Sequence, residues 1–211
     1  MRMNVHSGGE KMKPIATPDP IIAQAVKLFA ERGYAETNLP SIAKAANVAV
    51  GTIYRHFKGK EDILNTAFTD IMDYFHDSLA DAANCNVSDP ESTFSHLFDA
   101  AALTMQHYPT ELHFIEQNVF NEALRPESRA ARDRVTTLIS NMLMEGQEHG
   151  VIVKADVRTQ LAILYGSIVS MIDIVWVQQQ LQGHVPDQDQ LALELKNQIW
   201  NGLTCERSIF Q

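Results

Sequence analysis

The stretch NVAVGTIYRHFKGKEDIL, residues 47–64, is basic and aromatic within a chain of 211 residues whose formal net charge is -9. Residues 50–57 fit a helix with one apolar face, because at about 100° per residue four side chains fall within an arc of roughly 100°. These are Val50, Ile53, Tyr54 and Phe57. The rest of the circumference carries Gly51, Thr52, Arg55 and His56. The pattern therefore predicts a short helix that packs on one face and exposes the other.

Two more helices are predicted before this one. Residues 19–33 begin with Asp19 and Pro20, which suit the first positions of a helix, and end at Gly33, a residue typical of helix ends. A short helix over 38–46 begins at Asn38, a favourable N-cap. Asn47 then stands where the chain must turn, and asparagine tolerates the left-handed conformation better than most residues. Two short helices joined by a tight turn predict a helix-turn-helix.

The outward face of helix 50–57 carries side chains that suit DNA. Arg55 can read a guanine edge or grip a phosphate, and Thr52 can bond to a base or touch a thymine methyl. Tyr54 and Lys60 can reach phosphates. Helical periodicity supports a second interpretation equally well, in which these helices belong to an all-α core with a solvated basic face.

The charge is divided unevenly along the chain. Residues 1–60 hold nine lysines and arginines against four acidic residues, a balance of +5, whereas the remaining residues hold eight against 22, a balance of -14. A basic head on an acidic body favours contact of the head alone with a polyanion.

The rest of the chain is predicted to be helical, with no convincing strand, so the expected fold class is all-α. Proline or aspartate opens most of the further helices, and glutamate and aspartate occupy the first turn of the one that begins at residue 60. Their expected ranges are 60–83, 90–107, 109–121, 126–148, 157–182 and 187–203. We expect a disordered tail over 1–17, a helix-turn-helix head over 18–60 and a larger body over 61–211.

The spacing of the head resembles the N-terminal DNA-binding domain of TetR-family transcriptional regulators. The resemblance covers about residues 20–66, and the matching positions are Phe29, Gly33, Thr37, Ile42, Ala43, Val48, Gly51, Tyr54, Phe57, Lys60 and Glu61. The chain departs from the family at Asn47, where glycine is usual, and at Ala49, where a capping serine is usual. The missing cap costs on the order of 1 kcal/mol. Pro40 also stands where the family often has a polar or basic residue.

The resemblance implies a function and a set of DNA contacts. The contacts fall on Thr37, Ser41, Gly51, Thr52, Tyr54, Arg55, His56 and Lys60. The implied function is a cytoplasmic repressor that binds a palindromic double-stranded operator as a homodimer and is released by a small-molecule effector. The alternative is a regulator of the same fold that is controlled by a protein partner or that activates transcription.

A dimer interface is expected from two helices of the body. Residues 161–177 are apolar nearly all round, but the stretch is short for a membrane span and contains Asp173, so we expect no membrane segment. A helix buried on two sides fits better, and which side meets a partner subunit stays open. The first candidate stripe is Leu164, Ile168, Met171 and Val175. The second is Leu191, Leu195, Ile199 and Gly202, and the two stripes would form a four-helix interface.

An effector site is expected around Asp173, the only charged residue between Arg158 and Asp187. A buried carboxylate needs a partner, which is either a neighbouring group of the fold or a cationic or hydrogen-bond-donating ligand. The second hypothesis adds an aromatic and polar cage of Phe94, Phe98, His113, Phe114, Gln117 and Trp176, from helices that the family places around its pocket.

Enzyme and metal chemistry find little support in the sequence. We find no paired Glu-x-x-His motif, no phosphate-binding glycine loop and no nucleophile elbow. The group of His107, Glu111, His113 and Glu116 is interpreted as a solvated polar turn, and a helical metal-binding protein is the remote alternative. No metal or cofactor is expected. Cys85 and Cys205 are expected to be separate thiols in a reducing cytoplasm.

Overall fold

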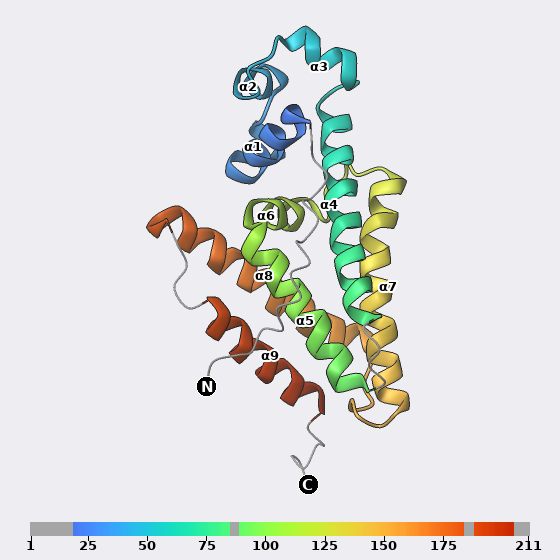
Figure 1. The fold of residues 1–211 in the computed structure, drawn as a ribbon. Coiled ribbons are helices and arrows are strands. Elements are labelled where there is room, and N and C mark those ends of the chain that lie inside the picture. The colour runs from blue at the N-terminus through green and yellow to red at the C-terminus, as the bar shows by residue number, and fades with distance from the viewer. Residues whose placement is uncertain (1–18, 85–88, 184–187, 205–211) are drawn as a thin grey trace.

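The computed structural model describes residues 19–84, 89–183 and 188–204, so the tail expected over 1–17, both cysteines and Asp187 lie outside the described residues. Within these ranges the chain forms nine α-helices and no strand, which confirms the all-α prediction (Figure 1). They are α1 (Pro20–Glu36), α2 (Leu39–Ala45), α3 (Val50–His56), α4 (Lys60–Ala83), α5 (Pro90–His107), α6 (Pro109–Asn118), α7 (Pro126–Glu148), α8 (Val157–Gln182) and α9 (Gln188–Thr204).

Local sequence signals fix the three helices of the head. The Asp19 carboxylate accepts from the Ile21 N–H, and Asn38 and Ser41 form a reciprocal capping box at the start of α2. Gly33, with φ 81°, interrupts α1 at the predicted end of its regular part. Asn47, with φ 54°, is left-handed as expected, and Ala49 caps α3 with no side-chain hydrogen bond. The chain therefore turns sharply between α2 and α3.

A small apolar core holds the head together and continues into the body. Phe29, Ile42 and Ile53, one from each helix, have no exposed surface. Phe29 stacks on Phe114 of α6 with ring centroids 5.9 Å apart, and Phe68 of α4 meets the same ring edge-on at 6.5 Å. Phe114 therefore connects α1 of the head to α6 and α4 of the body.

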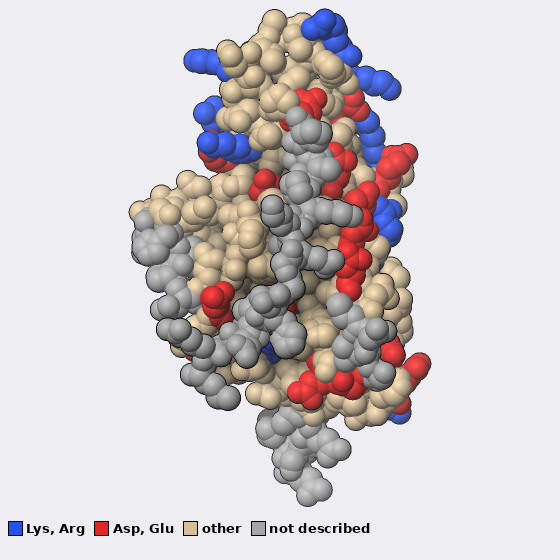
Figure 2. All heavy atoms as spheres, viewed as in Figure 1, with Lys and Arg blue, Asp and Glu red and all other residues tan. Residues whose placement is uncertain are grey.

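The body is a bundle in which α4 runs alongside α7 and contacts α5, while α6 lies under α1 and against α8 (Figure 1). Helix α9 packs on α5 and α8. Lysines and arginines stand out from the head, and acidic side chains gather over the body (Figure 2). The visible face therefore matches the division of charge in the sequence.

Helix α8 is the most apolar helix that the structure describes. Its residues Val157–Leu181 are long and apolar enough to span a membrane by length and composition, and 33% of the most apolar window is buried within the chain. A core helix of a soluble protein meets the same criterion. Length and hydropathy alone therefore do not assign α8 to a membrane.

Candidate functional site

The face of α3 that carries Arg55 and His56 is exposed, and Tyr54, which was expected on the packed face, lies on the exposed side as well. Tyr54 is 61% exposed, and Arg55 and His56 are exposed beside it. An Arg55 guanidinium nitrogen lies 3.4 Å from the Thr52 hydroxyl, to which it donates. Gly51 is exposed, and a Cβ added there would meet no atom within 4 Å. Packing within the head therefore does not require a glycine at this position, whereas close approach of another molecule would.

Two expected DNA contacts have partners inside the head. The Thr37 side chain is 2% exposed, and its hydroxyl donates to the carbonyls of Gly33 at 2.9 Å and Leu28 at 3.3 Å. The Lys60 ammonium donates to the carbonyls of Tyr34 at 2.7 Å and Thr37 at 2.8 Å, and lies 4.2 Å from the centre of the Tyr34 ring. Both side chains thus have partners at the end of α1, and a contact of either one with DNA stays a prediction.

One signal in the sequence could have identified this role for Lys60. The last carbonyls of a helix have no partner within the helix, and a lysine side chain nearby can donate to them. The fold of a three-helix head brings the start of α4 close to the end of α1. The Ser41 hydroxyl is also engaged, because it donates to the Asn38 carbonyl at 2.7 Å within the capping box. Ser41 is half-buried and stays in the candidate set.

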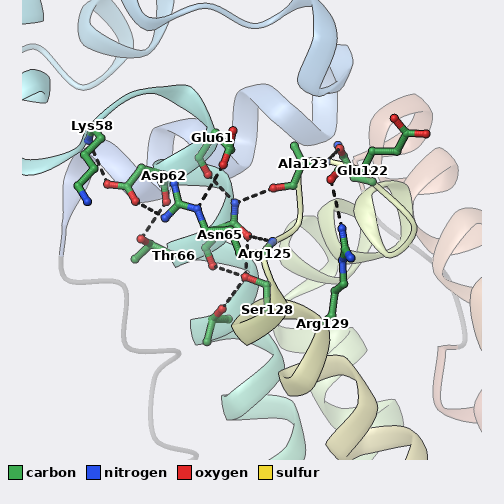
Figure 3. Close-up of polar contacts among 12 residues, drawn as sticks. Lys58, Glu61, Asp62, Asn65, Thr66, Glu122, Ala123, Arg125, Ser128 and Arg129 are labelled. Carbon is green, nitrogen blue, oxygen red and sulfur yellow. Dashed lines mark hydrogen bonds and ion pairs between the residues drawn. The ribbon is translucent and has the colours of Figure 1, made fainter.

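A buried polar joint fastens the start of α4 to the segment before α7 (Figure 3). The Asn65 amide donates to the carbonyls of Glu61 at 2.8 Å and Ala123 at 2.9 Å. Its oxygen accepts from the Arg125 backbone N–H at 2.7 Å and the Ser128 hydroxyl at 2.8 Å. Because Asn65 is buried and all four hydrogen bonds are made, its position on α4 is specified closely.

An ion pair covers the outer side of this joint. Arg125 donates to the Asp62 carboxylate at 2.7 Å and to Glu61 at 3.2 Å. The backbone N–H of Lys58 also donates to Asp62 at 3.0 Å. This N–H and then Arg125 hold the pKa of Asp62 below its usual value. Asp62 therefore connects the first turn of α4 both to the turn after α3 and to the segment before α7.

Four of the expected effector residues come together between α6 and α8. The His113 ring stacks on Trp176 with centroids 4.5 Å apart and planes at 16°. Its Nδ1 lies 3.4 Å from the Asp173 carboxylate, and its Nε2 lies 2.8 Å from the Gln117 amide nitrogen. Burial lowers the pKa of His113, and the Asp173 carboxylate acts in the opposite direction. Asp173 thus faces a histidine of its own chain.

The three phenylalanines of the expected cage lie elsewhere. Phe114 is fully buried under the head, and Phe94 stacks on Trp200 of α9 with centroids 5.0 Å apart. Phe98 packs beside Phe94 and lines a space of about 20 Å³ between α5, α8 and α9. An aromatic cage around Asp173 is therefore not formed, because these rings pack in the core and against α9 instead.

The expected dimer stripe of α8 faces its own subunit. Leu164, Met171 and Val175 are buried, and Ile168 packs against the same cores. On α9, Ile199 is buried and Leu191 and Leu195 are half-buried, whereas Gly202 is exposed. The exposed apolar side chains of α8 include Ile163, Ile174 and Val177. The sequence left the choice of face open because α8 is apolar all round.

An open groove runs between α8 and α9 on this exposed side. Its volume is about 860 Å³. Ala162, Gly166, Ser167 and Ser170 line the α8 side together with Ile163 and Ile174, and Leu191, Glu194, Leu195 and Gln198 are among the residues on the α9 side. Small residues on α8 leave room for another helix to approach closely.

Both parts of the chain match models of known protein families. Residues 21–67 match the model of bacterial regulatory proteins of the tetR family, and residues 68–205 match the tetracyclin repressor-like C-terminal domain. The fatty acid metabolism regulator protein of Bacillus subtilis is 30% identical over 161 residues, which are 74% of this chain and 81% of that protein.

Two solved structures of regulators are similar to this chain in both sequence and fold. The fatty acid degradation regulator FadR from Bacillus halodurans is 27% identical with a TM-score of 0.72, over 93% of this chain and 100% of that one. FadR from Bacillus subtilis in complex with stearoyl-CoA is 25% identical with a TM-score of 0.65, over 87% and 98%. Together with the helix-turn-helix and the helical body, these matches show that the chain belongs to the tetR family of transcriptional regulators.

Proposed function

We propose that this protein is a ligand-responsive transcriptional repressor that binds a palindromic operator as a homodimer in the cytoplasm. The observation that carries the proposal is the outward face of α3, where Arg55 and Tyr54 project from a helix that the turn at Asn47 sets against α2. Arginine suits a guanine edge and tyrosine a phosphate. Thr52, His56, Ser41 and the open backbone at Gly51 complete the proposed contact surface.

The groove between α8 and α9 supports the dimer. A second copy of the chain would place its own α8 and α9 against this groove and bury Ile163, Ile174 and Val177, which are otherwise exposed apolar side chains. A four-helix interface of this kind matches the two helices that the sequence indicated. The proposed interface uses the exposed face of α8, together with Leu191 and Leu195 of α9.

The effector is proposed to be a long-chain acyl-CoA. A Bacillus subtilis relative binds stearoyl-CoA, and the space between α5, α8 and α9 is lined by apolar side chains that include Met105 and Met171. That space now measures about 20 Å³, so an acyl chain must displace side chains to enter it. Methionines suit such a rearrangement because they have three rotatable bonds and no branch.

Control by a protein partner is the second candidate, and the groove is the observation that favours it. A filled core with an exposed apolar surface is the arrangement expected of such a regulator. The two candidates differ in what occupies the groove. A homodimer in solution with the groove buried would leave no comparable surface for a different protein.

The DNA assignment is tested by selection from a random duplex library. We expect enriched palindromes whose half-sites are about 34–36 Å apart or a multiple of that distance, and affinity that falls steeply with salt. A Tyr54→Ala, Arg55→Ala double variant should lose at least about 30-fold in affinity, since two contacts of about 1–3 kcal/mol each contribute at least about 2 kcal/mol together. Arg129→Ala, on the exposed side of α7, is the matched control. Wild-type binding by the double variant would refute the assignment.

The effector assignment has a separate test on the same complex. Stearoyl-CoA should raise the melting temperature of the protein and release the selected DNA, whereas coenzyme A without an acyl chain should do neither. If both compounds have no effect, the acyl-CoA proposal is wrong and the DNA assignment is unaffected.

A further inference from the structure

We propose that His113 and Glu116 of α6 and Asp173 of α8 form a binding site for one divalent transition-metal ion. One ligand atom from each side chain lies within 4.8 Å of the others. His113 Nδ1 is 3.4 Å from an Asp173 oxygen and 3.8 Å from a Glu116 oxygen. The three residues thus offer one nitrogen and two oxygens from two neighbouring helices.

The buried nitrogen of His113 is the observation that points to a ligand. His113 is 7% exposed, and no described residue gives its Nδ1 a hydrogen-bond partner. An Asp173 carboxylate oxygen lies 3.4 Å from Nδ1, which is longer than a usual N–H···O hydrogen bond. A buried polar atom without a partner destabilises the fold, and a metal ion bound to this nitrogen would remove that penalty.

Neighbouring side chains fix the orientation of the His113 ring, as is usual for a histidine that binds a metal ion. Trp176 stacks on one face of the ring, and Gln117 contacts Nε2, the nitrogen on the far side from Asp173. In the structure the Gln117 amide nitrogen faces Nε2. Binding of an ion at Nδ1 therefore requires the amide to turn over, so that its oxygen accepts from Nε2–H while Nδ1 keeps its lone pair for the ion. Such a partner for the second ring nitrogen is usual for metal-binding histidines.

The distances require a modest movement of one side chain. Ligand atoms bound to one ion at about 2.0–2.2 Å lie roughly 3–3.5 Å from one another, which the His113–Asp173 pair already satisfies. Glu116, with its side chain 24% exposed, has room to rotate toward the other two. Asp173, with its side chain 50% exposed, gives the ion a path from solvent and leaves room for water as a further ligand.

The donor set selects the class of metal. One imidazole and two carboxylates suit Zn²⁺, Co²⁺ or Mn²⁺, whereas Mg²⁺ and Ca²⁺ prefer oxygen ligands alone. A cation also offsets the repulsion between the two carboxylates. The competing explanation is a simple pair of protonated His113 with Asp173, which uses neither Glu116 nor a metal.

The place of the site in the fold suggests what an ion would do. It would join α6 to α8 directly below the head, and α6 packs against α1. An ion would therefore fix the helix on which the head rests, in addition to filling the site.

The test is metal titration of the full-length protein after treatment with EDTA. We expect one Co²⁺ per protomer, seen by its visible absorption bands, and displacement of Co²⁺ by Zn²⁺ but not by millimolar Mg²⁺. Asp173→Asn and Glu116→Gln, both at partly exposed positions, should each weaken Co²⁺ binding at least tenfold. His113→Gln should abolish it. Glu111→Gln, which changes another carboxylate of α6 outside the cluster, is the matched control.

The outcomes separate the two explanations without any use of DNA or acyl-CoA. Thermal unfolding of each variant in EDTA confirms that it folds. Co²⁺ should raise the melting temperature of the wild type and of Glu111→Gln equally, that of Asp173→Asn and Glu116→Gln less, and that of His113→Gln not at all. No stoichiometric uptake, or equal uptake by wild type and Asp173→Asn, would show that the cluster is an ion pair and not a metal site.

Discussion

The head and the body of this protein are stabilised in different ways. In the head, α2 and α3 have seven residues each. Helix α2 is fixed by a capping box, α3 follows the tight turn at Asn47 without a side-chain cap, and each buries one or two apolar side chains. In the body, α4, α7 and α8 have 23 to 26 residues and share long apolar surfaces, with polar clusters at a few points. Local contacts therefore determine how the short helices of the head pack. A long apolar face in the body can instead pack against its own subunit or against another molecule.

The largest expected effect comes from a charge in the groove of the body. Ile174 is 46% exposed and lines the α8–α9 groove, so Ile174→Glu leaves the subunit core intact but places a carboxylate in the proposed interface. We expect a folded monomer by light scattering. Operator affinity should fall by at least about 100-fold, because the second half-site is no longer held by the same particle.

The control is Leu103→Glu, which adds the same charge to an exposed leucine of α5 outside the groove. This variant should stay dimeric and bind operator. A dimeric, DNA-competent Ile174→Glu protein would show that the groove is not the interface, and the contrast between the faces of α8 would then need another explanation.

An intermediate effect is expected at the end of α1. Lys60→Met removes a charged donor from the carbonyls of Tyr34 and Thr37, and hydrogen bonds of this kind contribute about 2 kcal/mol together with their desolvation. The head should unfold at lower urea concentration than the body, which would turn one transition into two by circular dichroism and tryptophan fluorescence.

Lys58→Met provides the comparison, since Lys58 is exposed two residues earlier. It should leave stability within about 0.5 kcal/mol of the wild type. If Lys60→Met weakens DNA binding with unchanged stability, Lys60 acts on phosphate as the family resemblance implied, and the role assigned to it in the head is incorrect.

The smallest effect on stability is expected from low pH at the polar joint between the start of α4 and the segment before α7. The Lys58 backbone N–H and then Arg125 hold the pKa of Asp62 below its unfolded value. These contacts therefore stabilise the fold above the unfolded pKa, and the stabilisation is lost as pH falls through the folded pKa. Asp62→Asn should remove no more than about 1 kcal/mol at pH 7 and nothing near pH 2. Urea unfolding of wild type and variant at both pH values measures the difference, with Glu148→Gln on the exposed end of α7 as control. A variant equally destabilised at both would exclude a charge effect.

The sequence predicted the fold well because its signals are local. Proline, aspartate and asparagine opened most of the helices where expected, and Asn47 adopted the left-handed turn. The functional side chains were harder to place. The sequence suggested a phosphate contact for Lys60 but did not show its hydrogen bonds to the carbonyls at the end of α1. Helix α8 gave no periodic signal to separate its inner face from its outer one. Pairing of His113 with Asp173 joins residues 60 positions apart, which no local pattern encodes.

The bond between Lys60 and the end of α1 has a mechanical consequence. Lys60 is the first residue of α4, so the three helices of the head are attached to one end of a rod of 24 residues, about 36 Å long at 1.5 Å per residue. A rotation of that rod by about 5° around its far end carries the head sideways by roughly 3 Å, close to the 3.4 Å rise between base pairs. If the proposed function holds, a small repacking deep in the body would be amplified into a shift of the head along the double helix.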